Sequence, residues 1–129
     1  MKNIVLTVAA FYGLMAVVLG AFGAHAFKKI LSVEKLASFE VGVRYQMYHA
    51  IALLAIGLFF NFSNGMERSA AWLLMIGTFV FSVSIYFLSF SEYWGANLKF
   101  LGPITPLGGL MMVIGWGILV FYFAKTKFN

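Results

Sequence analysis

The distribution of hydrophobic residues divides the chain into four long apolar stretches separated by short polar segments. These stretches are Ile4–Ala24, Gln46–Phe60, Ala70–Leu88 and Leu107–Ala124. A helix of roughly 20 apolar residues spans the hydrocarbon core of a bilayer, which is about 30 Å thick. The pattern therefore predicts an all-α membrane protein, with four transmembrane helices in an up-down bundle that forms one domain over residues 1–129. Including flanking residues, we expect the helices at about 3–26, 33–61, 68–90 and 106–125.

The second apolar stretch is short for a complete crossing, and the amphipathic segment Val33–Arg44 precedes it. The apolar positions of this segment recur at helical spacing. This pattern favours a helix that lies at the membrane interface before the chain turns inward. Gly42 would then be a hinge, or merely a weak point in one long helix. Ser32 before this segment, and Thr105 before Pro106, are typical of helix N-caps.

Composition supports the membrane assignment and narrows the chemistry. Hydrophobic residues make up 63% of the chain and charged residues 10%, against roughly 45–50% and 25% in soluble domains. The absence of cysteine excludes disulfides, thiolate metal sites and a cysteine nucleophile. The net charge of +5 suits anionic lipid headgroups. Because the basic residues flank the apolar stretches, we expect membrane lipids and no nucleic acid as partners.

The N-terminal stretch has some features of a secretory signal peptide, because Lys2 precedes it and Ala24-His25-Ala26 resembles a cleavage site. A signal h-region is about 7–15 residues long, and this apolar run is longer. We therefore expect the segment to be retained as the first transmembrane helix.

Four crossings place both termini on one face of the membrane, here called side A, and the loops near residues 26–32 and 89–105 on the other, side B. The basic residues are Lys2, Arg68, Lys125 and Lys127 on side A, and Lys28, Lys29, Lys35, Arg44 and Lys99 on side B. The positive-inside rule needs a clear asymmetry in such counts. The sequence therefore assigns no orientation.

Polar side chains are predicted to converge at side B, where all four helices begin or end. They are His25, Arg44, Tyr45, Gln46, His49, Ser82, Tyr86 and Thr105. Polar groups at membrane depth are costly unless paired, and they tend to face the interior and to be functional. We therefore expect a polar pocket at this face. Structural interpretations also exist: Tyr45 and Gln46 as interhelical hydrogen bonds, His49 as a buried histidine bonded to a neighbour, and His25 as a cap for the last carbonyls of its helix. Glu40 and Arg44 are spaced for a structural ion pair.

Other chemistry at side B stays open at this point. His25 and His49 could be axial haem ligands or part of a metal site, with Glu40 or water as a third ligand for zinc. Because their spacing is not diagnostic, we assign no catalytic residue and no metal, and we expect no cofactor. The loop Gly102–Pro106 either starts a helix or presents N–H groups to an anion such as a lipid phosphate.

Short motifs along almost the whole chain resemble a family of small membrane proteins known as domain of unknown function 423. The motifs are Gly20–Ala26, Tyr45–Ala50, Phe81–Tyr86, Gly102–Gly109 and Gly115-Trp116. The resemblance implies four transmembrane helices in the inner (cytoplasmic) membrane of bacteria, with relatives in mitochondria. It implies no reaction, but its motifs coincide with the predicted polar pocket.

Three classes of function fit these observations. The leading interpretation is a non-enzymatic integral membrane protein that binds a lipid or amphiphile, with the headgroup at side B and the tail along small-residue faces. Ala16, Gly20 and Ala24 form such a face, and a face of this kind could also join copies into a homo-oligomer. The alternatives are a haem- or quinone-type redox protein or other membrane enzyme that uses the two histidines, and an oligomeric transporter or channel subunit.

Overall fold

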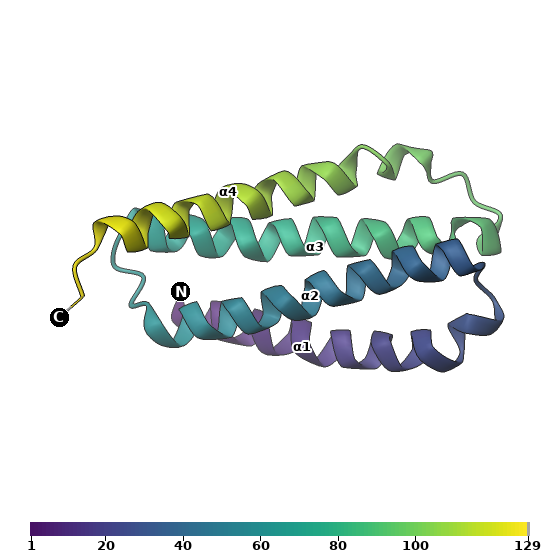
Figure 1. The fold of residues 1–129 in the computed structure, drawn as a ribbon, viewed down its shortest axis with the longest axis horizontal. Coiled ribbons are helices and arrows are strands. Elements are labelled where there is room, and N and C mark those ends of the chain that lie inside the picture. The colour runs from purple at the N-terminus through teal and green to yellow at the C-terminus, as the bar shows by residue number, and fades with distance from the viewer. Residues whose placement is uncertain (129) are drawn as a thin grey trace.

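A computed structural model describes residues 1–128 as four long helices and two short 3-10 turns. The elements are α1 (Lys2–His25), η1 (Phe27–Lys29), α2 (Val33–Phe59), α3 (Gly65–Trp94), η2 (Lys99–Leu101) and α4 (Ile104–Lys125). Consecutive long helices run antiparallel (Figure 1). The N-terminus, the α2–α3 loop and the end of α4 therefore lie at side A, and η1 and η2 lie at side B.

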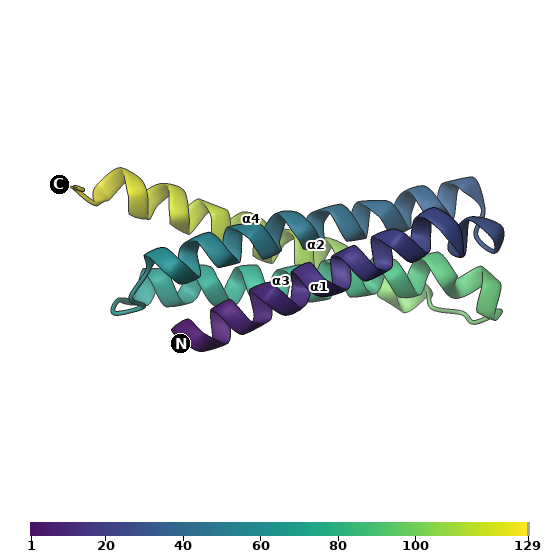
Figure 2. The same cartoon turned by 90° about the horizontal axis from the view of Figure 1, so that it is seen from below.

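Three segments are long and apolar enough to cross a membrane: Lys2–His25, Gly65–Trp94 and Lys99–Lys125. α2 is not among them, because its first half carries the charged and polar residues Glu34, Lys35, Glu40 and Arg44–His49. In both views α2 extends beside α1 and α3 over most of their length (Figures 1 and 2). The prediction of an all-α membrane protein is confirmed.

The helices pack in chain order: α1 lies along α2, α2 along α3, and α3 along α4, which leaves α1 and α4 on opposite flanks (Figure 1). α4 reaches α2 through side chains, including a ring contact between Phe59 and Phe123 with centroids 6.3 Å apart. The main buried apolar cluster lies in the half of the molecule nearer side A, and it includes Val5, Leu53, Leu74 and Leu119.

α2 is continuous from Val33, so the amphipathic segment forms its first turns and Gly42 lies within it. A Cβ added at Gly42 would lie 2.8 Å from the ring of Tyr86, so this glycine permits close approach of α3 to α2. Of the two interpretations of the segment, the structure shows the single long helix. Ser32 caps it as predicted, because its Oγ accepts a hydrogen bond from the Lys35 N–H at 3.2 Å.

The ends of α3 and α4 differ from the expected boundaries. α3 begins at Gly65 because Asn64 caps it, with Oδ1 accepting from the Glu67 N–H at 3.0 Å. It ends where Gly95 takes a left-handed conformation with φ of 65°. α4 begins at Ile104, so Thr105 lies inside its first turn and does not act as the N-cap.

Candidate functional site

Gln46 joins three helices near the middle of the molecule. Its Nε2 donates to the carbonyl of Tyr12 on α1 at 2.9 Å, and its Oε1 accepts from the Tyr86 hydroxyl on α3 at 2.7 Å. The Tyr12 hydroxyl in turn donates to the Met75 carbonyl on α3 at 2.7 Å. Gln46 is buried, and every polar atom of its amide group has a partner. This arrangement holds α1, α2 and α3 together in a region where water cannot supply substitutes.

His49 connects α2 to α4. Its Nδ1 lies 2.7 Å from the carbonyl of Tyr45, and its Nε2 accepts from the Trp116 indole N–H at 3.1 Å. A carbonyl only accepts and an indole N–H only donates, so the ring is neutral with its proton on Nδ1. Both ring nitrogens are therefore engaged within the chain. Trp116 itself is 45% exposed, so the bond lies close to the surface that faces lipid.

Two serines on α3 complete the interior polar contacts. Ser82 Oγ donates to the Gly42 carbonyl on α2 at 2.8 Å. The hydroxyls of Ser84 and Thr105 lie 2.6 Å apart and link α3 to the first turn of α4. These hydrogen bonds hold neighbouring helices together and are called the polar fasteners, a term that also covers the bonds of Gln46, His49 and Glu67. Within residues 1–128, every buried side-chain nitrogen or oxygen atom has a hydrogen-bond partner.

The remaining predicted residues are at the surface. His25 and Arg44 are exposed, and Tyr45 is 42% exposed with its ring 5.2 Å from that of Phe81. Arg44 Nε lies 3.5 Å from the backbone carbonyl of Glu40, so the contact shown between these two residues is not with the carboxylate. The structure thus does not bring the eight candidate residues into one pocket.

The two histidines lie at different depths. Gly13 of α1 is level with Ala50, since an added Cβ would lie 3.9 Å from that residue. His25 is about twelve residues further along α1, which is roughly 18 Å from the level of His49. No group of three or more His, Cys, Asp or Glu side chains suitable for a metal ion occurs in the part of the chain that the structure describes. The geometry therefore offers no support for a shared metal or haem site at these histidines.

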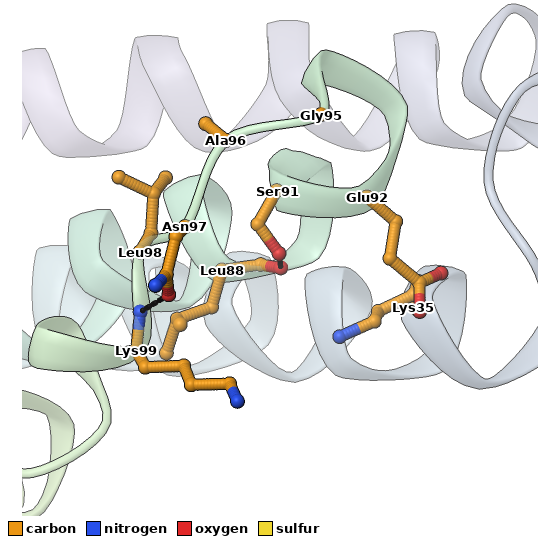
Figure 3. Close-up of a pocket in the computed structure, with 9 residues that line it drawn as sticks. All are labelled: Lys35, Leu88, Ser91, Glu92, Gly95, Ala96, Asn97, Leu98 and Lys99. Atoms are coloured by element: carbon orange, nitrogen blue, oxygen red, sulfur yellow. Dashed lines mark hydrogen bonds between the residues drawn. The ribbon is translucent and has the colours of Figure 1, made fainter.

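A smaller hollow at side B, of about 190 Å³ between α1 and α2, is lined by Glu40 and Arg44. The larger open space is a cleft between the ends of α2, α3 and α4, made of two adjoining hollows of about 500 and 480 Å³. Lys35 and Leu88 line both hollows, and this side-B cleft also contains Ser38, Val41, Ile85, Ser89, Ser91, Glu92, Asn97, Lys99 and Thr105. Figure 3 shows Lys35 and Glu92 on one side of the outer hollow of the cleft, the one of about 500 Å³, and Lys99 on the other. The charged residues Glu92 and Lys99 line the outer hollow only, and the inner hollow combines apolar residues such as Val41 and Ile85 with the hydroxyls of Ser38, Ser89 and Thr105.

The cleft was not predicted apart from Thr105, although the sequence held a signal for it. Lys35, Ser38 and Val41 are spaced three apart and so share one face of α2. An interfacial helix, which the amphipathic pattern favours, would not place this face against α3 and α4. Lys99 lies in a loop, and helical periodicity gives no information about loops.

A second polar cluster, also unpredicted, lies at side A around Glu67. This residue is 5% exposed. Its carboxylate accepts from the Ser63 N–H at 3.2 Å, the Asn64 amide at 3.0 Å and the Tyr122 hydroxyl at 2.7 Å. The spacing Asn64-x-x-Glu67 is a capping-box pattern that the sequence could have revealed.

Helical spans, a polar interior that fastens the helices to one another and a cleft at one end define a polytopic helical membrane protein. The family model described as "Protein of unknown function (DUF423)" matches residues 19–109. The chain belongs to this family, as the sequence motifs indicated.

Proteins similar to the chain carry the name UPF0382 membrane protein. One from Staphylococcus epidermidis is 39% identical over 126 residues, which cover 98% of each chain. Another, from Haemophilus influenzae, is 39% identical over 127 residues and also covers 98% of each. A third, from Schizosaccharomyces pombe, is 36% identical over 114 residues, covering 88% of this chain and 95% of the relative. No solved structure matches the chain.

Proposed function

We propose that the protein is a non-enzymatic membrane protein of the bacterial inner (cytoplasmic) membrane that binds an anionic phospholipid or similar amphiphile in the side-B cleft. The observation that carries the proposal is the division of this cleft into two parts. Lys99 and Glu92 line only the outer hollow, Val41 and Ile85 line only the inner hollow together with Ser38, Ser89 and Thr105, and Lys35 and Leu88 line both. A phospholipid has the same order of charge and hydrocarbon along its length.

The lengths of the helices support this location for a headgroup. α3 has 30 residues, and at 1.5 Å per residue it is about 45 Å long, against a hydrocarbon core of about 30 Å. Its last turn carries Tyr93 and Trp94, which are 58% and 52% exposed. Such aromatic residues are typical of the headgroup layer. The outer part of the cleft therefore fits the depth of a lipid phosphate.

The charges favour an anion. Two lysines and one glutamate, Glu92, line the cleft, so its net charge is positive. A lysine near the surface contributes about 1 kcal/mol to attraction of an anionic lipid. Replacing both lysines should therefore cost about 2 kcal/mol, or a thirtyfold increase in Kd.

The test is thermal unfolding of the purified, delipidated chain in mild detergent, with phosphatidylglycerol or phosphatidylcholine added. A ligand that binds only the folded state raises stability in proportion to its affinity. We expect phosphatidylglycerol to stabilise the wild-type chain and to lose most of this effect with Lys35→Gln/Lys99→Gln. The matched control is Lys28→Gln/Lys29→Gln, which removes the same charge from exposed positions at side B.

Two results would overturn the proposal. One is equal loss of the phosphatidylglycerol effect in both double variants, since general attraction to the surface would then suffice. The other is absence of stabilisation of the wild-type chain by any phospholipid or quinone.

A further inference from the structure

A groove at side A, separate from the cleft at side B, lies between the first half of α3 and the second half of α4. It consists of two adjoining hollows of about 520 and 460 Å³, and both are lined by Gly65 and Met66. The inner hollow is apolar and includes Ile114, Gly117 and Phe121. The outer hollow includes Asn64, Lys125 and Thr126. These hollows together are called the side-A groove, and they are of ligand-pocket size.

Gly117 differs from the other glycines along the contact of α3 and α4. A Cβ added at Gly77, Gly108 or Gly115 would lie 3.0 Å or less from atoms of the opposite helix. A Cβ added at Gly117, or at Gly65 on α3, would meet nothing within 4 Å. Packing of α3 on α4 therefore does not require a glycine at residue 117. Because Gly117 has no side chain, the space above its backbone in the groove is empty.

The outer end of the groove is cationic. Lys125 lies in the last turn of α4, and its Nζ is 5.1 Å from the centroid of the Phe121 ring. This places the ammonium group where the apolar and polar hollows meet. The nearby Glu67 carboxylate accepts hydrogen bonds from Asn64, Tyr122 and the Ser63 N–H. Those donors reduce its demand for Lys125 as a counter-ion.

We infer that the side-A groove binds a phospholipid of the leaflet opposite to that of the cleft, with an acyl chain over Gly117 and an anionic phosphate at Lys125. The inner hollow lies on helices that span the membrane, where the surrounding medium is hydrocarbon. The lysine is placed where the phosphate of a lipid in that leaflet would lie. A helix of a second copy could also pack on an open glycine, but it would not use the cationic outer hollow.

The experiment uses the full chain in nanodiscs that contain phosphatidylglycerol with a diazirine near the end of one acyl chain. After irradiation, labelled peptides are mapped by mass spectrometry. Gly117→Leu fills the inner hollow and, because the site is open, should leave the fold intact. Ala55→Leu is the matched control, because it adds similar bulk to an exposed site on α2 in the same half of the molecule. Intact folding of each variant is checked by gel filtration and helical circular dichroism.

We expect labelling of residues 114–121 in the wild-type chain, a loss of at least fivefold in Gly117→Leu, and no change in Ala55→Leu. Lys125→Gln should reduce labelling by the phosphatidylglycerol derivative more than labelling by a phosphatidylcholine derivative. Labelling at this groove should persist in Lys35→Gln/Lys99→Gln, which makes the site independent of the cleft. Unchanged labelling in Gly117→Leu overturns the inference. So does chemical cross-linking between copies that Gly117→Leu abolishes, because the occupant would then be a second chain.

Discussion

The contact of α3 with α4 provides a sharp test of the structure, because it depends on Gly108. A Cβ added there would lie 2.5 Å from the backbone nitrogen of Phe81 and 2.9 Å from the carbonyl oxygen of Gly77. Ordinary van der Waals contact of a Cβ begins at 3.4 Å. The substitution Gly108→Ala therefore requires the two helices to separate by about 1 Å, because no backbone atom can rotate away as a side chain does.

The size of the effect follows from two opposing contributions. Overpacking typically costs about 1–3 kcal/mol, and rigid backbone neighbours place Gly108→Ala at the upper end. Alanine also favours a helix over glycine by about 1 kcal/mol. Gly117→Ala gains the same helix preference without a steric contact, since nothing lies within 4 Å of its added Cβ. The helix preference of alanine is the same in both variants and cancels when their free energies of unfolding are compared. The remaining difference, due to overpacking at residue 108, should be about 3 kcal/mol.

The assay is the free energy of unfolding, measured by titrating each variant from mild detergent into sodium dodecyl sulfate and following helical circular dichroism. Gly108→Ala should be destabilised relative to the wild-type chain, and Gly117→Ala should equal or exceed the wild-type stability. If the two variants differ by less than about 1 kcal/mol, the close approach of α3 to α4 argued from these contacts is wrong.

Three further predictions concern the polar fasteners. Trp116→Phe removes the hydrogen bond to His49, so unfolding should become easier by about 0.6–1.7 kcal/mol. A double-mutant cycle with His49→Ala should show that the two substitutions are not additive. Tyr86→Phe should cost a similar amount because it leaves one acceptor of Gln46 unpaired, and tryptic digestion should reveal looser packing of α2 on α3. Glu67→Gln replaces one acceptor oxygen by a donor among three donors, so a loss of about 1–3 kcal/mol is expected in the same unfolding titration.

The helices could be predicted from the sequence, because a membrane imposes long apolar segments whatever the tertiary contacts are. The boundaries were less predictable, since they depend on caps: Asn64 starts α3 earlier than its apolar run, and α4 begins at Ile104. The face of small residues on α1 was identified, but its use could not be. Gly20 of this face and nearby Gly23 lie against Val43 and Phe39 of α2, so part of the face packs within the chain, whereas Ala24 is exposed.

The candidate site was predictable only in part. The sequence correctly indicates polar residues at the level of Gln46 and His49, because their cost in hydrocarbon requires partners. It does not name the partners, since the Tyr12 carbonyl is a backbone group and Trp116 appears in sequence as an ordinary interfacial or packing residue. The prediction of one polar pocket also assumes that the side-B ends of all four helices lie close together. Packing in chain order, with α1 and α4 on opposite flanks, instead keeps His25 away from Thr105.

This packing order explains why one face of α2 has two different roles along its length. Lys35, Ser38, Val41, Tyr45 and His49 are three or four residues apart, so they share the face of α2 that borders α4. The outer members line the cleft, where α2 and α4 are apart. The inner member, His49, accepts a hydrogen bond from Trp116 and so links α2 to α4 through side chains. Under the proposed function, an acyl chain in the cleft would lie against Val41, Ile85 and Leu88, and the His49–Trp116 bond lies about two helical turns deeper along α2. The outer residues of this face, Lys35 and Ser38, thus line the cleft proposed to hold a lipid, whereas His49 joins α2 to α4 below it.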